Sequence, residues 1–323
     1  MSGASAQASG MDLVAVGETM AVFTAPRLGR LRDMERLSLG AAGSESNVAI
    51  GIARLGYRAA WVGRTGADEF GALIRAKLAA EGVDVSHVLV DATAQTALMF
   101  KEHRLPEVVR VTYYRRGFAG SHLCPEDLEA DLFAAARIVH VTGISLGLSE
   151  SAAAAVERAV ELARRGSALV SFDLNYRAAL WDQATAAGPL RALAEAADVV
   201  FAGEDELAII GDGEVERTAF SLLEHRPQAV VIKRGAKGAA AVTAEGILEE
   251  AARPVAAVDP VGAGDGFVAG YLAGVLDGSD LAGRLRLGCA VGAYVVATPG
   301  DWEGLPSRAD LALMDHGPGA TLR

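Results

Sequence analysis

The sequence has few cysteines and a deficit of positive charge. Cys124 and Cys289 are the two cysteines among 323 residues, too few for a disulfide framework, which favours a reducing cytoplasm. The 30 Lys and Arg are outnumbered by 41 Asp and Glu, which gives a net charge of −11. Such a chain lacks the broad basic surface that nucleic acids or anionic membranes require. An anionic ligand would therefore have to be bound by local Arg and Lys side chains.

Long apolar runs and signal sequences are also missing. No stretch reaches the length of a transmembrane helix. Residues 1–11 lack the charged start and apolar segment of a secretory signal, and we expect them to form a disordered leader. No repeat of fixed period occurs. Because 51% of the residues are hydrophobic, the chain can bury one large core, and we expect a single domain over residues 12–323.

Several familiar catalytic motifs do not occur. The sequence has no Gly-x-x-x-x-Gly-Lys-Ser/Thr loop, which argues against a P-loop nucleotidase. It has no Gly-x-Ser-x-Gly elbow, and none of its His or Cys spacings is typical of zinc. Gly262–Phe267 carries a phenylalanine where a dinucleotide-binding fingerprint needs its third glycine, and it lies far from the first strand.

Alternating strand and helix patterns are present instead. They predict a mainly parallel sheet with helices on both faces. The candidate strands are Leu13–Gly17, Ala60–Gly63, Ile138–Val141, Ala168–Asp173, Val199–Ala202 and Ala229–Lys233. The candidate helices are Asn47–Leu55, Asp68–Gly82, Glu150–Arg165, which Gly166 would end, and Pro189–Ala197.

Two segments depart from this alternation. Residues 20–38 and 95–115 carry strand patterns, which in the second segment flank a turn at Leu105–Pro106. We expect them to form a small β-sheet inserted into the domain. Such a sheet could cover a site as a lid or be an ordinary hairpin at the sheet edge. Periodicity does not separate these two possibilities.

Ligands of parallel α/β sheets bind at the carboxyl ends of the strands. This rule selects three segments that directly follow candidate strands, Asp173–Arg177, Gly203–Glu206 and Lys233–Gly238. A further loop rich in small residues, at positions 40–47, would precede the first helix.

The most informative stretch is Val258–Gly270, in which Gly262, Gly264 and Gly266 surround Asp265. Small residues before a helix allow backbone N–H groups to converge on an anion. A carboxylate there would repel a phosphate, so its presence needs a reason. One hypothesis is that it accepts a proton during a reaction while the N–H groups hold the charge that develops. A glycine-rich turn with a helix-capping aspartate is the alternative. These residues alone leave both hypotheses open.

Together, the motifs at residues 40–47, 233–238 and 259–265 resemble those of the ribokinase-like carbohydrate kinases, also called the phosphofructokinase-B family. Within that family, Tyr113–Arg115 and Asp173–Trp181 are most similar to the 2-keto-3-deoxygluconate kinases. The resemblance implies a three-layer α/β/α fold with a small β-sheet lid. It also implies transfer of the γ-phosphoryl group of ATP to a sugar hydroxyl.

The resemblance further implies roles for individual residues. Asp265 would be the general base, and the N–H groups at Gly262, Ala263, Gly264 and Asp265 would hold the transferring phosphoryl group. The implied sugar-binding residues are Gly43, Ser44, Asn47, Met99, Tyr113, Arg115, Arg177, Asp265 and Asp301. The implied nucleotide-binding residues are Asn175, Gly203, Lys233, Gly235, Ala236, Lys237, Gly238, Gly262, Ala263, Gly264 and Cys289. Glu206 would bind Mg²⁺ through water, or would simply be an acid at a helix start.

Arg115 and Arg177 bear on the substrate, because a guanidinium matches the carboxylate of a keto-acid sugar. A surface ion pair is the alternative for Arg177. Met99, Gly203 and Cys289 stand where relatives carry Tyr, Asn and Asn, respectively.

We therefore expect a kinase that uses ATP and Mg²⁺ to phosphorylate the terminal hydroxyl of 2-keto-3-deoxygluconate. Kinases of 2-keto-3-deoxygalactonate, fructose or ribose are the alternatives of the same class. A non-catalytic sugar-binding protein would need no base such as Asp265, and a nicotinamide-dependent dehydrogenase has only the α/β pattern in its favour. The resemblance also implies a homo-oligomer, a dimer or larger, and suggests activation by a monovalent cation near the loop after Asp259.

Overall fold

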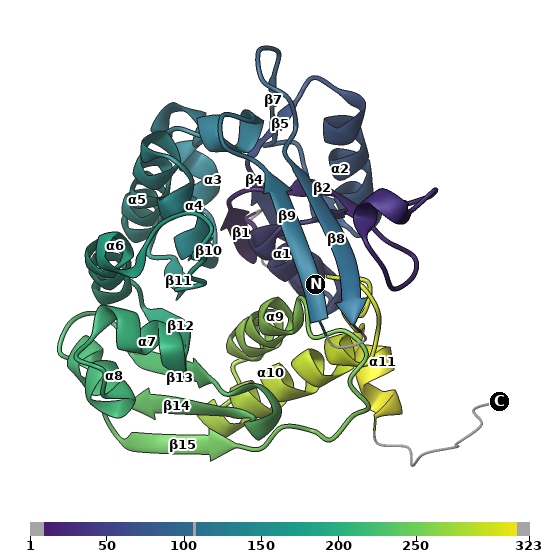
Figure 1. Cartoon of the computed structure of the whole chain (residues 1–323). Helices are drawn as coiled ribbons and strands as arrows, with labels where there is room; N and C mark the ends of the chain where they lie inside the picture. Colours follow the sequence, from purple (N-terminus) through teal and green to yellow (C-terminus); the bar gives the residue numbers. More distant parts are fainter. Residues whose placement is uncertain (1–9, 106–107, 315–323) are drawn as a thin grey trace, which may run out of the picture.

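The computed structural model describes residues 10–105 and 108–314 of the chain. Within these residues, a nine-stranded sheet has the order β15-β14-β13-β12-β11-β10-β1-β4-β6 (Figure 1). Neighbouring strands from β13 to β6 are parallel, and β14 and β15 are antiparallel at one edge. The strands are β1 (Leu13–Val16), β4 (Ala59–Val62), β6 (Val83–Asp84), β10 (Ile138–Thr142), β11 (Leu169–Asp173), β12 (Val199–Gly203), β13 (Ala229–Lys233), β14 (Ala239–Thr243) and β15 (Gly246–Glu250). The expected leader and the expected turn at Pro106 fall mainly outside the described residues.

The central strands are apolar throughout because both faces of the sheet are covered. Along β1, Val14 and Val16 belong to one hydrophobic cluster, and Leu13 and Ala15 belong to another. Alternate side chains of a strand point to opposite faces, so the two clusters are the cores on the two sides of the sheet. The sheet is therefore the middle of three layers, and the predicted α/β/α arrangement is confirmed.

Helices from separate parts of the chain cover the two faces (Figure 1). One face carries α1 (Ser44–Arg54), α2 (Glu69–Ala80), α9 (Ala263–Leu276) and α10 (Leu281–Val296). The other carries α3 (Ala130–Ala134), α4 (Gly143–Leu148), α5 (Glu150–Gly166), α6 (Gln183–Ala196), α7 (Glu204–Ile210) and α8 (Val215–Leu223). The remaining helices are α11 (Arg308–Leu313) and the 3₁₀ turns η1 (Leu31–Asp33), η2 (Ala119–His122), η3 (Pro125–Asp127) and η4 (Gly235–Lys237). Every helix of the described ranges is too short or too polar to span a bilayer.

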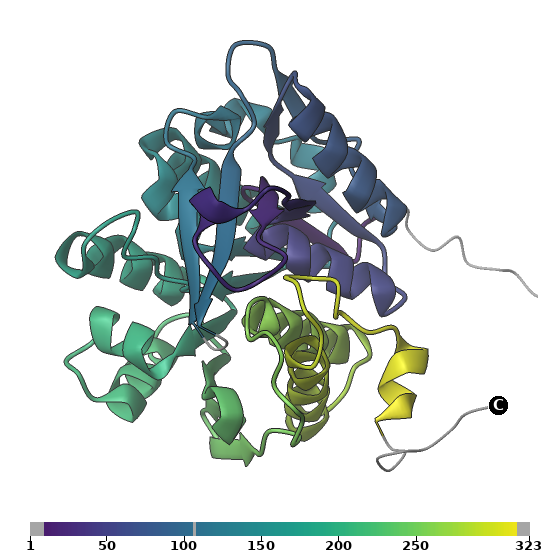
Figure 2. The same ribbon diagram turned by 45° about the vertical axis from the view of Figure 1, so that its right-hand side comes forward.

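The small sheet packs against α2 and has the order β3-β2-β8-β9 (Figures 1 and 2). Its strands are β2 (Met20–Thr24), β3 (Ser38–Ala42), β8 (Leu98–Leu105) and β9 (Val108–Tyr114). Met20, Val22, Ala42, Ala97 and Met99 form a separate small core on it. A two-stranded pair, β5 (Arg64–Gly66) and β7 (Leu89–Asp91), completes the strands of the described residues.

Three expected helix boundaries are wrong. The loop predicted at residues 40–47 consists of the end of β3 and the first turn of α1, which begins at Ser44 because Gly43 in an extended conformation is its N-cap. Pro189 lies inside α6, which begins six residues earlier because Asp182 caps it. A proline in a helix interior removes one backbone hydrogen bond, and α6 tolerates this loss. Gly166 is the last residue of α5, and the left-handed residue after it is Ser167.

Gly63 directly follows β4, and its backbone lies close to Gly17 and Trp61 of the same chain. A Cβ at this position would lie 2.4 Å from the carbonyl oxygen of Gly17 and 2.4 Å from the ring of Trp61. We expect Gly63→Ala to lower the free energy of unfolding by about 1–3 kcal/mol, because a buried backbone and a buried indole ring must shift. Urea denaturation measures this change.

Gly40→Ala is the matched control for Gly63→Ala. A Cβ at Gly40 has its nearest neighbour 4.0 Å away, at Glu303 Oε1. The control should therefore change the free energy of unfolding by less than about 0.5 kcal/mol. Equal stability of Gly63→Ala and the unchanged protein would contradict the close contact at β4.

Candidate active site

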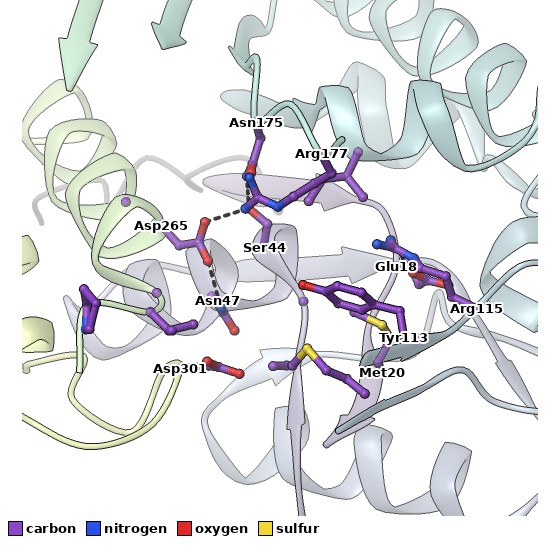
Figure 3. Close-up of a pocket in the computed structure, with 18 of the residues that line it drawn as sticks. Glu18, Met20, Ser44, Asn47, Tyr113, Arg115, Asn175, Arg177, Asp265 and Asp301 are labelled. Atoms are coloured by element: carbon purple, nitrogen blue, oxygen red, sulfur yellow. Dashed lines mark hydrogen bonds and ion pairs between the residues drawn. The ribbon is translucent and has the colours of Figure 1, made fainter. Parts of the chain in front are cut away.

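A cavity of about 380 Å³ lies between the carboxyl ends of the central strands, the start of α9 and the small sheet (Figure 3). It collects residues that are far apart in the sequence. All of the expected sugar-binding residues line it, namely Gly43, Ser44, Asn47, Met99, Tyr113, Arg115, Arg177, Asp265 and Asp301. Five further expected site residues also line it, namely Asn175, Glu206, Lys233, Gly262 and Gly264.

The remaining residues expected on the nucleotide side do not line this cavity. Gly235, Ala236 and Lys237 form the exposed turn η4 just after β13. Cys289 is buried in α10, and burial raises the pKa of its thiol to about 11, so the thiol stays protonated at neutral pH. Ala263, Gly203 and Gly238 also lie outside the lining.

The start of α9 depends on a close approach of the backbone at Gly262. This residue is the N-cap of α9 and has a φ of 78°, in the left-handed region that favours glycine. A Cβ at this position would lie 1.8 Å from the carbonyl oxygen of Asp301. The turn therefore requires glycine, and it places Asp265 in the first turn of the helix.

Asp265 is held by two hydrogen bonds from α1 (Figure 3). Ser44 Oγ donates to its Oδ1 at 2.6 Å, and Asn47 Nδ2 donates to its Oδ2 at 2.7 Å. Asn175 Nδ2 donates in turn to Ser44 Oγ at 2.7 Å. Asn175, with a φ of 40°, is one of two non-glycine residues with positive φ in the described chain. The contact with Ser44 connects Asn175 to Asp265, a connection that the sequence analysis did not anticipate.

The environment of Asp265 favours its protonated form more than water does. Burial raises its pKa to about 6, against the opposing effect of the hydrogen bonds from Ser44 and Asn47. Burial likewise raises the pKa of the neighbouring Glu45 to about 7, although Thr142 Oγ1 donates to it at 2.6 Å. A carboxylate whose pKa lies close to neutral pH can accept a proton from a substrate and later release it.

The two arginines of the cavity differ in their surroundings. Arg115 is buried, and its Nη2 lies 2.5 Å from Oε2 of the buried Glu18. Arg177 is exposed, and its Nη1 donates to the carbonyl oxygen of Tyr176 at 3.1 Å. Figure 3 shows Arg177 reaching toward Asp265 and Ser44, with Arg115 farther along the wall beside Glu18. Arg115 is therefore already neutralised by a protein acid, and Arg177 is the more available cation.

Lys233 Nζ donates to both carboxylate oxygens of the buried Asp173, at 2.7 and 2.6 Å. Burial opposes the charge on Lys233, but Asp173 and Glu206 outweigh it and raise the pKa of the ammonium group. Glu206 accepts backbone N–H groups from Tyr176 at 2.8 Å and from Gly203 at 2.7 Å. This is the helix-start role that the sequence left open for Glu206.

The fit of a magnesium ion to these residues is limited. Across residues 10–105 and 108–314, no three His, Cys, Asp or Glu side chains converge as a metal site. Each carboxylate oxygen of Glu206 is already engaged with a backbone N–H group. A magnesium ion would therefore take its ligands mainly from water and from the phosphates of a nucleotide, as it commonly does.

Sequence reasoning missed Lys101 and Glu18. Lys101, on β8, is buried and its Nζ donates to Asp301, so the small sheet is joined to the main domain at the cavity. No local pattern distinguishes such an inward-pointing lysine within a strand. Glu18 lies just beyond β1, and Ile144, which also lines the cavity, lies just beyond β10. The rule that ligands bind at strand ends would have found Glu18 and Ile144, had it been applied to β1 and β10.

The pfkB family carbohydrate kinase profile matches residues 11–308. The chain belongs to this family. It is 40% identical to the 2-dehydro-3-deoxygluconokinase of Bacillus subtilis (strain 168) over 308 residues, which cover 94% of each protein. It is 38% identical to the 2-dehydro-3-deoxygluconokinase of Thermoproteus tenax over 302 residues, which cover 92% of each. The crystal structure of a PfkB protein from Polaromonas sp. JS666 has a TM-score of 0.85 at 35% identity, over 94% of this chain and 99% of that one.

These comparisons confirm the expected family and the ribokinase-like fold. They also show that the protein is a carbohydrate kinase, so that the cavity beside Asp265 is the candidate active site of a phosphotransferase. The identities above extend over nearly the whole chain, including the small sheet.

Replacing Asp265 should change how the stability of this kinase depends on pH. Burial raises the pKa of Asp265 to about 6, whereas an unfolded aspartate titrates at about 3.9. The folded state therefore holds this proton more tightly, and its stability falls as the pH rises from about 4 to about 6. Asp265→Asn removes the ionisable group and with it this loss of stability at higher pH. We expect the variant to melt at a higher temperature than the unchanged kinase at pH 8, with little advantage at pH 4.

Asp182→Asn is the control of opposite sign for this melting experiment. Hydrogen bonds from Thr185 lower the pKa of Asp182, so its ionised form stabilises the folded state increasingly as the pH rises. The control variant should therefore gain no advantage at pH 8. Calorimetric melting at both pH values measures the effects. A difference between Asp265→Asn and the unchanged kinase that does not grow with pH would contradict the raised pKa.

Proposed function

We propose that this kinase transfers the γ-phosphoryl group of ATP to the terminal hydroxyl of 2-keto-3-deoxygluconate. One observation carries the proposal: a carboxylate of raised pKa, Asp265, shares a cavity with the exposed cation Arg177. The first suits a sugar hydroxyl that must lose a proton, and the second suits the carboxylate of a sugar acid. The two curated relatives named above, both 2-dehydro-3-deoxygluconokinases, support this substrate.

In this proposal, Asp265 accepts the hydroxyl proton while the sugar oxygen bonds to the γ-phosphorus and the bond from that phosphorus to ADP breaks. The backbone N–H groups of Gly264 and Asp265 lie in the first turn of α9, where N–H groups have no partner within the helix. They are available to the phosphoryl oxygens, and the helix dipole favours negative charge at this position. The N–H group of Ala263 is directed to the carbonyl oxygen of Pro260 at 3.3 Å and contributes less.

The nucleotide would approach from the strand-end turns after β12 and β13, and Mg²⁺ would arrive with its phosphates. When bound, the ion would neutralise phosphate charge during the transfer. The small sheet would act as a lid, because it forms one wall of the cavity and would exclude water that competes with the sugar. Pairing of copies into a homo-oligomer and activation by a monovalent cation remain predictions.

Of the two arginines, we assign the main contact with the sugar carboxylate to Arg177, because it is exposed and lines the cavity. Arg115 adds N–H donors to the same wall, but Glu18 already balances its charge. Gly43, Asn47 and Asp301 also line the cavity and would bind the hydroxyl groups. Met99 contributes an apolar surface from the core of the small sheet and no hydrogen bond of the kind a phenol would make.

An ADP-release assay across a panel of sugars tests the substrate and the base together. We expect turnover to be fastest with 2-keto-3-deoxygluconate. Asp265→Asn should lower kcat by about 10²–10⁴-fold, because the general base is lost. It should leave sugar binding measurable by calorimetry, since asparagine has nearly the same shape.

The panel includes 2-keto-3-deoxygalactonate, fructose and ribose. Faster turnover of either neutral sugar than of any keto acid would overturn the substrate assignment. Retention of kcat in Asp265→Asn would overturn the role of the base. Sugar binding without turnover in the unchanged protein would show a non-catalytic binding protein.

Arg177→Gln tests recognition of the carboxylate. Loss of a hydrogen bond between charged groups costs about 1.5–3 kcal/mol, so KM for the sugar acid should rise about 10–150-fold with a smaller change in kcat. Arg115 is less suitable for this test, because its removal would leave Glu18 buried without a partner and would destabilise the fold. Steady-state kinetics measures the change.

Arg58→Gln is the control for Arg177→Gln. Arg58 precedes β4, at the amino end of the sheet, and its hydrogen bond to Asp12 is made by its backbone N–H. The control should leave KM unchanged. An unchanged KM in Arg177→Gln would contradict its contact with the carboxylate.

A further inference from the structure

A second cavity, of about 560 Å³, lies along β9, the edge strand of the small sheet. It is lined by β9 with the residues that follow it, and by residues 177–180, which follow β11. We call this cavity the arginine groove, because Arg110, Arg115, Arg116 and Arg177 line it. Its volume lies within the range of sites that hold small ligands.

The arginine groove adjoins the active-site cavity. Tyr113, Arg115 and Arg177 line both spaces. Figure 3 shows Arg177 reaching from the segment after β11 toward Asp265. A molecule in the groove would therefore lie next to the site of reaction, with the guanidinium of Arg177 within reach of both spaces.

The two cavities differ in charge. Acids line the active-site cavity, namely Glu18, Glu206, Asp265 and Asp301. None of the described residues that line the arginine groove is an aspartate or a glutamate. The net charge of −11 repels an anion at long range, so positive charge concentrated beside the active site would determine where an anion approaches.

Two arginines of the groove are exposed and not neutralised. Arg116 Nη2 donates to the carbonyl oxygen of Leu180 at 2.6 Å, and Arg177 Nη1 donates to that of Tyr176 at 3.1 Å. Neither arginine has an acidic partner among the described residues. The contact of Arg116 also joins the end of β9 to the segment after β11, so the shape of the groove is fixed before a ligand arrives.

Arg110, on β9, is exposed as well and only weakly paired. Its Nε lies 3.8 Å from Oε1 of Glu102, whose Oε2 lies 3.5 Å from Nη1 of Arg104. One acid between two arginines leaves an excess of positive charge, and an exposed pair at this distance contributes little. Arg110 therefore adds to the positive charge of the groove.

The place of the groove distinguishes between the two anionic substrates of the proposed reaction. The nucleotide would approach from the turns after β12 and β13. The groove lies instead along the small sheet, and the residues that it shares with the active site include Arg115 and Arg177, the two cations considered for a sugar carboxylate. Its charge therefore suits the approach of a sugar acid.

We propose that the arginine groove is the entrance through which an anionic sugar acid reaches the active site, with Arg110 and Arg116 attracting its carboxylate and Arg177 receiving it. This inference rests on the proposed sugar-acid substrate and adds its route of approach. No bond is made or broken in the groove. Charge of opposite sign along such a route raises the rate at which free ligand is captured, and salt screens the effect.

Arg110→Gln is the first test, because Arg110 lines the groove but not the active-site cavity. Charged clefts raise capture rates by about 10–10³-fold, so loss of one arginine should lower kcat/KM for the sugar acid about 3–10-fold at about 0.01 M salt. The Debye length falls from about 30 Å at that concentration to about 8 Å at 0.15 M, where the difference should largely disappear. The value of kcat should change less than about twofold, since the chemistry is untouched.

Arg110→Lys separates attraction by charge from a specific contact. Lysine keeps the positive charge but lacks the planar fork with which arginine binds a carboxylate. The lysine variant should therefore keep kcat/KM for the sugar acid close to the unchanged value at both salt concentrations.

Arg217→Gln is the matched control. It removes the same charge from an exposed arginine on α8, which is paired with Asp212 at 2.8 Å. This variant should retain kcat/KM at low salt. A second control lies within Arg110→Gln itself, where kcat/KM for ATP at saturating sugar should be unchanged, because ATP takes another route.

Four outcomes would overturn the entrance. The first is an unchanged kcat/KM for the sugar acid in Arg110→Gln at low salt. The second is a loss that persists undiminished at 0.15 M salt, which would indicate a fixed contact in the bound complex. The third is a fall in kcat as large as that in kcat/KM. The fourth is an equal loss for ATP or in Arg217→Gln, which would indicate the charge of the whole protein.

Failure of this inference differs from failure of the proposed function. The sugar panel is measured first, on the unchanged kinase. Turnover of a sugar acid there, followed by an unaffected Arg110→Gln, would overturn the groove alone. Turnover of neutral sugars only would overturn the proposed substrate, and the entrance with it, before any variant is compared.

Discussion

The hydrogen bonds between the first turns of α1 and α9 are the contact on which the candidate active site depends. Ser44 and Asn47, near the start of α1, both donate to Asp265, near the start of α9. The two helices lie on the same face of the sheet and pack against each other. Because both begin at the carboxyl edge of the sheet, their first turns meet where parallel strands place ligands. The left-handed turn at Gly262 brings the carboxylate to this meeting point.

The charges around this point are largely paired within the protein. Arg115 is paired with Glu18, Lys101 with Asp301, and Lys233 with Asp173, and each of these three acids is buried. Such pairs hold the cations in fixed positions, so that little reorganisation is needed when a charged ligand arrives. Arg177 differs, since within the described chain it has no ion-pair partner. The paired cations therefore shape the site, whereas Arg177 is available to the carboxylate of a ligand.

Much of this site could be predicted from the sequence, because its clearest signals are local. The glycines around Asp265 must form a tight turn before a helix, and their spacing reveals this without any contact. The strand ends at Asp173 and Lys233 follow from short apolar runs that only a buried parallel strand explains. Helix starts were harder to predict. Asp182 caps α6 and Pro189 lies inside it, because capping and packing outweigh the tendency of proline to begin a helix.

The sequence by itself determined the family and the α/β/α layering and singled out Asp265 as a candidate base, because these depend on periodicity and on a motif of neighbouring residues. Only the tertiary structure decided which charges meet. Glu18 lies 97 residues before Arg115, and Lys101 lies 200 residues before Asp301, so no local pattern links either pair. The same holds for Lys233, whose motif continues into an exposed turn while its ammonium group binds Asp173. The pairing of side chains across strand ends depends on the order of strands in the sheet, and that order is a property of the whole fold.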